Sequence, residues 1–432
     1  MKKTNFIYAL AAGTLLLGSC SSDDVNNGAE NNDAAQTIVL QVANAGDGLT
    51  TRAGRPLESS EAAQNIQNVR VIVCQNNIIK YVTTIDNWND DQTSTVYTDG
   101  GHGRQTTITI PKENHLSAGT YKVYAIGYSN DSDYDLTAIT GAIAGSTFNE
   151  NTVLKYKQDG SKTPEEIFAG DATYTVVEGE KTEGKVILNR QVAGTFGYIE
   201  DIPYVEGATK LELVASASNS ELVLGAFGNF DLTGNGTGND ANVKYVVNGN
   251  NTTTNAVVYT IDLTKWFTAL KDDKKLAEDG ETYEDGTDGL IDAGDNWKGD
   301  AKKYKNGSVF AGSFLIPFAK TDGQTFTLKL VKDDGTAVRS WKVNLPESDG
   351  QLQAHNLMTW STNAFTTASV TDQKEIYSVV RNHLYGIGTR TSANPDKPGE
   401  GGGDKPQSLK RAQDITLRVN DNWEVIHNME LE

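Results

Sequence analysis

Cysteine is scarce in this sequence, with only Cys20 and Cys74 among 432 residues. Two cysteines allow at most one disulfide, and Cys20 follows an N-terminal apolar segment that assigns it another role, so we expect no structural disulfide. Cys74 ends the segment 69–74, which is apolar except for Arg70. We expect it to be a buried strand residue that packs as a small hydrophobe.

Histidine is also rare, and the familiar catalytic motifs are missing. No metal-ligand spacing joins the five histidines, which are His102, His115, His355, His383 and His427. No Gly-x-Ser-x-Gly elbow, Walker loop or dinucleotide-binding glycine motif occurs, and no Asp/Glu pair stands out for glycoside hydrolysis. The turn 231–236 resembles half of a calcium loop, but position twelve is Asn242 rather than Glu. We therefore expect no enzyme, no cofactor and no metal site.

The sequence lacks long hydrophobic runs and an excess of positive charge. Its longest apolar segment, residues 6–17, is too short for a membrane-spanning helix. The formal net charge of −19 argues against nucleic acid as a partner. What the sequence does contain is Thr, Val, Tyr and Gly in short runs between turn signals, which indicates an all-β fold. The length exceeds that of one hydrophobic core, so two domains are expected.

The N-terminus reads as an export signal. Lys2 and Lys3 precede the apolar segment, which ends in Leu17-Gly18-Ser19-Cys20. This box resembles the lipobox of bacterial lipoproteins, so residues 1–19 are predicted to be a signal peptide and Cys20 the lipidated residue. Residues 20–36 are mainly polar and acidic, as expected of a spacer between a membrane and a folded domain.

A short strand and an exposed loop follow. Residues 37–44 place Ile38, Leu40 and Val42 on one face of a strand. The loop 46–60 is rich in small residues and glycine around two arginines, which is typical of segments that proteases cut. Cleavage is predicted after Arg52, before Ala53. Arg55 is a second choice, because Pro56 follows it.

The last stretch of the chain has the pattern of a strand without a domain. Its apolar positions are Ile415, Leu417, Val419, Trp423, Val425, Met429 and Leu431. It follows a Gly- and Pro-rich segment, residues 391–410, that reads as a flexible linker. The tail also matches the first strand: Ile38-x-Leu40-x-Val42-x-Asn44 corresponds to Ile415-x-Leu417-x-Val419-x-Asp421, with Arg418 in place of Gln41. The two strands are therefore predicted to be interchangeable.

The domain boundaries are placed at turn-rich breaks. We expect the first strand and propeptide end over residues 37–52, one β-sandwich over 53–183, a second over 184–390, and a donor strand over 411–432. Residues 163–168 are predicted to form a capped helical turn, and 263–270 a short helix with Asp262 or Thr264 as its cap. The last core strand is expected within residues 377–387.

Several segments, taken in order, resemble the Bacteroidales fimbrillins, the subunits of type V pili, and most closely the stalk subunits of the minor fimbriae of Porphyromonas. Beyond the lipobox and Thr51-Arg52-Ala53, the matching segments are residues 166–170, 188–194, 308–314, 380–385 and 417–428.

The resemblance implies two tandem transthyretin-like β-sandwich domains and a precursor anchored to the outer membrane as a lipoprotein. It implies cleavage by an Arg-specific protease that frees the first strand, and head-to-tail polymerisation in which the C-terminal strand of one copy fills the groove of the next. The implied partners are further copies of the chain and the anchor and tip subunits of a surface fimbria. The implied roles are adhesion and biofilm formation.

Two alternatives stay open at this point. A surface lipoprotein that binds glycans would use exposed aromatic residues such as Trp88, Trp266 or Trp297 as sugar platforms, whereas Trp341 and Trp360 are expected in the core. A fimbrial tip adhesin is the other alternative. A tip subunit has no need to donate a strand to a more distal subunit, whereas this sequence contains the complete strand pattern of the tail.

Overall fold

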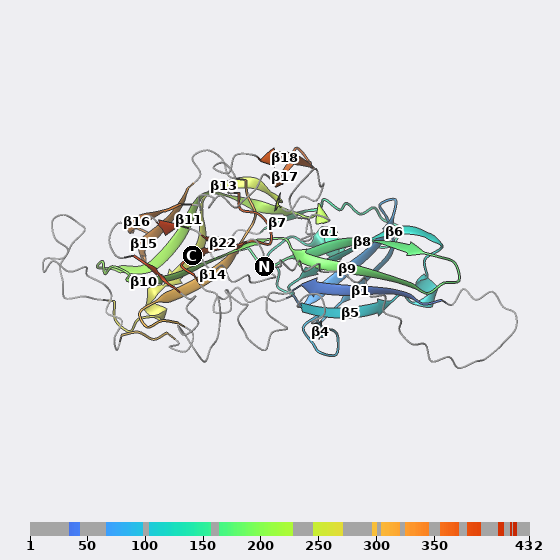
Figure 1. The fold of residues 1–432 in the computed structure, drawn as a ribbon, viewed down its shortest axis with the longest axis horizontal. Helices are drawn as coiled ribbons and strands as arrows, with labels where there is room; N and C mark the ends of the chain where they lie inside the picture. Colours follow the sequence, from blue (N-terminus) through green and yellow to red (C-terminus); the bar gives the residue numbers. More distant parts are fainter. Residues whose placement is uncertain are drawn as a thin grey trace, which may run out of the picture.

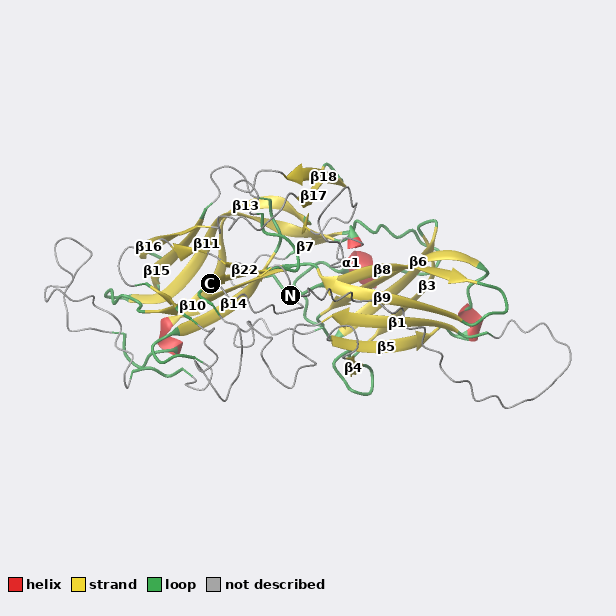
Figure 2. Cartoon of the chain, in the orientation of Figure 1, coloured by secondary structure: helices red, strands yellow, loops and turns green. Residues whose placement is uncertain are grey.

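The computed structural model describes residues 34–43, 66–97, 103–156, 164–227, 245–270, 296–299, 304–319, 325–344, 355–370, 378–389, 405–409, 415–416 and 418–420. Almost all of the regular structure in these residues is β-strand, which confirms the all-β prediction (Figure 2). The described strands fall into two main groups, called here the N-terminal unit and the C-terminal unit.

The N-terminal unit is an eight-stranded sheet in the order β3-β2-β6-β8-β9-β1-β5-β4 (Figure 1). Its strands β8 and β9 pair at only two positions, Phe168 with Arg190 and Ala169 with Asn189, so the sheet folds at that point into two facing halves. Apolar residues of both halves form one buried cluster between them. The strands are β1 (Gln36–Ala43), β2 (Asn68–Gln75), β3 (Ile78–Ile85), β4 (Thr95–Tyr97), β5 (Gly103–Thr109), β6 (Gly119–Tyr128), β8 (Phe168–Val176) and β9 (Thr182–Arg190).

The C-terminal unit consists of two sheets that face each other across a second core. One has the order β14-β10-β19-β22, with β20 also beside β10, and the other the order β13-β11-β15-β16-β21, with β7 beside β11. Its strands are β7 (Val153–Lys155), β10 (Ala193–Glu200), β11 (Ala208–Val223), β13 (Gly249–Asp262), β14 (Val309–Leu315), β15 (Phe326–Lys332), β16 (Ala337–Asn344), β19 (Leu384–Ile387), β20 (Gln407–Ser408), β21 (Ile415–Thr416) and β22 (Arg418–Asn420). A small third sheet combines β12 (Tyr245–Val247), β17 (His355–Ser361) and β18 (Ala364–Val370).

The predicted boundary at residues 183/184 is wrong, because β9 belongs to the N-terminal unit. This strand pairs in parallel with β1 from Gln36↔Thr182 to Val42↔Leu188. The chain passes into the C-terminal unit only after Arg190, at the two residues that separate β9 from β10. The Gly- and Glu-rich stretch before β9 is the loop that connects β8 to β9.

The helical segments are short. The helical turn predicted over residues 163–168 is wrong, since the described part of this stretch contains no helix and β8 begins at Phe168. The helix predicted over residues 263–270 is a single 3-10 turn, Leu263–Lys265, with Asp262 as its cap: the Thr264 N–H donates to Asp262 Oδ1 over 3.0 Å. The other described helical segments are Lys112–Asn114 and α1 (Thr137–Thr140).

A third buried cluster connects the two units. It contains Ile72 and Tyr124 from β2 and β6, and Phe196 and Phe310 from β10 and β14. Strand β7, which precedes β8 in the sequence, crosses over to pair with the end of β11. The units are therefore in continuous apolar contact, and they lie side by side along the long axis of the molecule (Figure 1).

Candidate functional site

Strand β1 occupies an interior slot of the N-terminal unit, between β5 and β9. It runs antiparallel to β5 and parallel to β9, with seven paired positions on each side. Ile38, Leu40 and Val42 are 0%, 0% and 1% exposed and pack in the core of this unit. The alternating pattern predicted for this strand is therefore the pattern that faces the core.

Polar contacts hold the beginning of β1. The Gln36 side chain makes a reciprocal pair with the backbone of Leu116: Nε2 donates to the Leu116 carbonyl over 2.8 Å, and Oε1 accepts from the Leu116 N–H over 2.9 Å. The Ile110 N–H donates to the Gln36 carbonyl, and the Thr182 N–H to the carbonyl of Ala35. These contacts fix the register of β1 at the end of the sheet.

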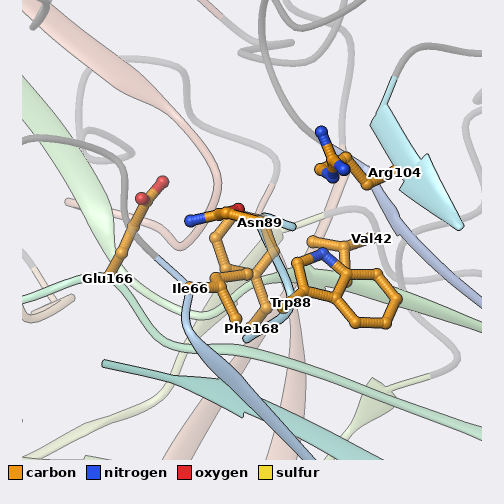
Figure 3. A pocket seen from close by; sticks show the side chains of 7 residues that line it. All are labelled: Val42, Ile66, Trp88, Asn89, Arg104, Glu166 and Phe168. Carbon is orange, nitrogen blue, oxygen red and sulfur yellow. The ribbon is translucent and has the colours of Figure 1, made fainter. Parts of the chain in front are cut away.

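The other end of β1 opens on a small hollow (Figure 3). Its lining residues are Val42, Ile66, Trp88, Asn89, Arg104, Glu166 and Phe168. Arg104 is the pairing partner of Val42, and its side chain is 11% exposed. Its guanidinium bonds the Ser94 side chain and carbonyl and lies 2.8 Å from the exposed carboxylate of Asp91.

The beginning of the C-terminal tail lies on its own chain. Strand β21 pairs with Val343 and Asn344 at the edge of one C-terminal sheet, and β22 pairs with Leu384, Tyr385 and Gly386 at the edge of the other. The prediction that the tail hangs free of the preceding domain is therefore wrong for these residues. Of the predicted donor residues, Ile415 and Val419 lie in these strands. Leu417, Trp423, Val425, Met429 and Leu431 lie outside the described residues.

Part of the predicted linker is also packed. Within residues 391–410, β20 pairs with Ile199 and Glu200 of β10, and Leu409 is 1% exposed in the C-terminal core. Gly388 permits the preceding turn because its φ is +80°, a backbone conformation that favours glycine. The free part of a linker would therefore be shorter than the sequence predicted.

Three of the segments that resemble fimbrillins meet at the junction of the two units. Arg190 Nε lies 2.5 Å from Glu166 Oε1, and both side chains are buried. Arg381 donates to the side chain of Gln191 over 3.0 Å and to the Gly225 carbonyl over 2.8 Å. The Asn382 N–H donates to the Val192 carbonyl. The sequence indicated these segments only by their resemblance to fimbrillins. Arg381 and Gln191 are 190 positions apart, so no local pattern could have predicted their contact.

Burial shifts the pKa of one side chain at this junction, Arg381. It lowers the pKa of the Arg381 guanidinium to about 9, so this side chain carries its charge at neutral pH. It contacts carbonyl oxygens and an amide oxygen, which are suited to a buried cation. A charged network of this kind serves to fix the relative position of two units and supplies no reactive group.

Other predicted sites are absent from the described residues or lie outside them. No group of His, Cys, Asp and Glu side chains that could hold a metal occurs in the part of the chain described. None of its helices is long and apolar enough to cross a membrane.

Trp88 is 1% exposed and is no sugar platform; Trp266 and Trp297 are packed against the core clusters. Trp341 is in the core as predicted, whereas Trp360 is only half-buried. The lipidation site Cys20 and the cleavage residues Arg52, Ala53 and Arg55 are not among the described residues.

Comparisons with known proteins identify the family. Two solved structures from Porphyromonas gingivalis are similar at 10% sequence identity. The tip fimbrial protein Mfa3 with a C-terminal truncation has a TM-score of 0.39 and covers 89% of this chain and 98% of its own. The fimbrial anchor protein Mfa2 has a TM-score of 0.31 and covers 81% and 100%. No curated protein matches. Residues 40–285, more than half of the sequence, match the profile of the fimbrillin-A associated anchor proteins Mfa1 and Mfa2. The chain belongs to this family of fimbrial proteins.

Proposed function

We propose that this protein is a structural subunit of a surface fimbria that polymerises by strand exchange. It is exported as a lipoprotein acylated on Cys20 and anchored to the outer membrane. An Arg-specific protease cuts it after Arg52, and β1 then leaves the N-terminal unit. The tail of a second copy fills the emptied slot, and the anchor and tip subunits of the fimbria are further partners.

The observation that supports this proposal is the position of β1. A strand with the apolar pattern of the tail occupies a fully buried slot, yet the predicted cut would separate it covalently from the rest of the unit. Loss of Ile38, Leu40 and Val42 uncovers apolar surface worth roughly 5–9 kcal/mol of transfer free energy. The tail offers seven apolar residues for that surface, and a head-to-tail contact of this kind extends without closing.

The tail must first leave its own domain. Strands β21 and β22 pair over two and three positions only, both at sheet edges. Short edge pairings are weak, so they can be exchanged for the interior slot of another copy. The donor is then held by two neighbouring strands instead of one.

Limited digestion with an Arg-specific protease tests the proposal. The cut full-length chain is expected to form a ladder of polymers on size analysis, and a truncation that ends at Lys410 is expected to stay monomeric. This truncation retains Leu409, the last described residue of the C-terminal core. Equal ladders from both chains would exclude the tail as donor. Arg52→Ala is expected to remain a monomer under the same treatment, and its polymerisation at the normal rate would move the cut to Arg55 or elsewhere.

A second experiment tests the lipid anchor. Cells fed radiolabelled palmitate are expected to label the wild-type precursor and not Cys20→Ala. Label on the variant would place the acyl chain on another residue.

A further inference from the structure

The match between the tail and β1 extends further than their apolar residues. β1 and the residue before it read Ala35-Gln36-Thr37-Ile38, and the tail reads Ala412-Gln413-Asp414-Ile415. Gln413 therefore stands where Gln36 stands, two residues before the first buried isoleucine. This position has a structural role in β1, because Gln36 makes the reciprocal pair with Leu116 described above.

The Leu116 backbone requires a partner at this place. Gln36 is 5% exposed and Leu116 is 8% exposed with β1 in place, so a strand that refills the slot after β1 leaves must bury this N–H and carbonyl again. An amide side chain satisfies both groups at once, since it carries one donor and one acceptor. An apolar side chain would satisfy neither, at the cost of two buried polar groups.

The opposite end of the slot distinguishes the two strands. In the sequence, Asn44 stands two residues after Val42, and Asp421 stands two residues after Val419. A residue at this spacing continues the face of a strand on which the earlier residue lies. The neighbouring cation is Arg104, which is the pairing partner of Val42 and lines the hollow beyond it (Figure 3). Diagonal neighbours on adjacent antiparallel strands are within reach of an arginine side chain. Asp421 therefore gains a charge interaction that the neutral Asn44 does not offer.

We propose that the incoming tail of a second copy is held in one register by two polar anchors: Gln413 on the backbone of Leu116, and Asp421 on Arg104. This inference rests on the proposed function and specifies the donor's position within the groove. In this register Ile415, Leu417 and Val419 replace Ile38, Leu40 and Val42. The tail runs parallel to β9, and Trp423 extends past the Val42 end towards the junction of the two units.

The register also places a residue on the outer face. Arg418 takes the position of Gln41, whose side chain donates to Gln105 Oε1 over 2.8 Å. A polymer of the double variant Gln105→Cys/Arg418→Cys is therefore expected to form disulfides between copies under mild oxidation, since directly paired antiparallel positions satisfy disulfide geometry. The matched control Thr106→Cys/Arg418→Cys puts the two thiols on opposite faces and is expected to stay unlinked. Linkage only in the control would overturn the register.

The first anchor is tested by two leucine substitutions in the full chain. Gln413→Leu is expected to speed the dissociation of cut polymers in urea by about tenfold, the change for at least 1.4 kcal/mol of lost hydrogen bonding. Gln36→Leu removes the same contacts from β1, so it is expected to destabilise the uncut precursor and leave polymer dissociation unchanged. Equal polymer dissociation for Gln413→Leu and wild type would overturn this anchor.

The second anchor is tested by charge exchange. Asp421→Asn gives the tail the same side chain as Asn44, its counterpart in the sequence of the first strand. This variant and Arg104→Glu are each expected to slow polymerisation after the cut by roughly three- to tenfold. The double variant Arg104→Glu/Asp421→Arg is expected to recover, because each chain supplies both partners of the restored pair. Asp421 lies outside the described residues, so Asp421→Asn changes no described contact and tests the anchor even if Arg104→Glu folds poorly. Wild-type rates for Asp421→Asn would overturn the anchor.

These results separate the inference from the proposed function. Polymers from the wild type, none from the truncation at Lys410, and no effect of the anchor variants would reject only the register. Absence of polymers from the cut wild type would reject strand exchange itself, and the register with it.

Discussion

Single side chains in the β1 slot determine how firmly the first strand is held. Leu40 is 0% exposed at the middle of β1, between β5 and β9. A buried leucine in a packed core loses its transfer free energy and leaves a cavity when it is shortened. The centre of the strand is therefore where substitution should weaken the precursor most.

We predict that Leu40→Ala lowers the free energy of unfolding of the uncut chain by about 2–5 kcal/mol. Urea denaturation followed by intrinsic fluorescence measures the change. Ile187→Ala is a matched control, because Ile187 is on the adjacent strand but is 46% exposed, and its effect should stay within about 0.5 kcal/mol. A loss at Leu40 no larger than that at Ile187 would contradict the buried slot.

Cys74 is a second residue whose burial has a measurable effect. It is 2% exposed and free, as the sequence predicted, and burial raises the pKa of its thiol from 9.0 to about 11. We predict no alkylation of Cys74 by iodoacetamide in the native chain at pH 8, and full alkylation in urea, read by mass spectrometry. The unfolded thiol releases its proton near pH 9 while the folded one keeps it, so this group's contribution to stability falls between pH 9 and 11.

Strands differ in how far sequence alone could identify them. The alternation in β1 was sufficient to predict its buried face, and the sequence reduced the cap of the 3-10 turn to two residues, of which Asp262 is the one observed. The assignment of β9 to the N-terminal unit was not predictable, because its partner β1 lies about 145 residues earlier in the sequence. Thr163-Pro164-Glu165-Glu166 reads locally as a helix start, but Glu166 is instead the buried partner of Arg190. The edge positions of β21 and β22 likewise depend on partners that a linear pattern does not contain.

The edge pairing of the tail leads to a prediction at the level of elements. Removal of residues beyond Lys410 uncovers the edge of β19 that pairs with β22, so the peptide that contains Leu384–Gly386 should exchange hydrogen faster in the truncation than in the full-length monomer. Hydrogen exchange with mass spectrometry measures this. Peptides from β2 are the internal control, since β2 lies between β3 and β6 in both chains. Identical exchange at β19 in the two monomers would show that β22 does not protect this edge in solution.

At the scale of the whole molecule, the junction makes one body of two units. An apolar cluster with residues from both units lies beside the ion pair of Glu166 and Arg190 and the buried Arg381. In the proposed filament, a subunit would transmit tension from its acceptor groove to its donor tail, and this junction would lie between them.

We predict that Glu166→Ala lowers the free energy of unfolding by about 3–5 kcal/mol, because it leaves the Arg190 charge buried without its carboxylate. The Arg190 guanidinium also donates to Asn382 of the C-terminal unit over 3.4 Å, so a displaced Arg190 should weaken the junction and separate the urea transition into two steps. Lys122→Ala is the control: it removes a surface pair with Asp171 and should cost less than about 1 kcal/mol. A single transition and a small loss for Glu166→Ala would mean that the apolar cluster alone holds the units together.

The pairing of β1 also determines the order of folding. This strand precedes the others of its unit in the sequence, but its neighbours are residues 103–109 and 182–188. A chain made or exported from its N-terminus cannot complete the slot until β9 has appeared, and such distant contacts form slowly. β1 is therefore made first and placed last. The groove is therefore open for a time in every new molecule. In the proposed polymerisation, the tail of a second chain would repeat the closing step by which each subunit folded.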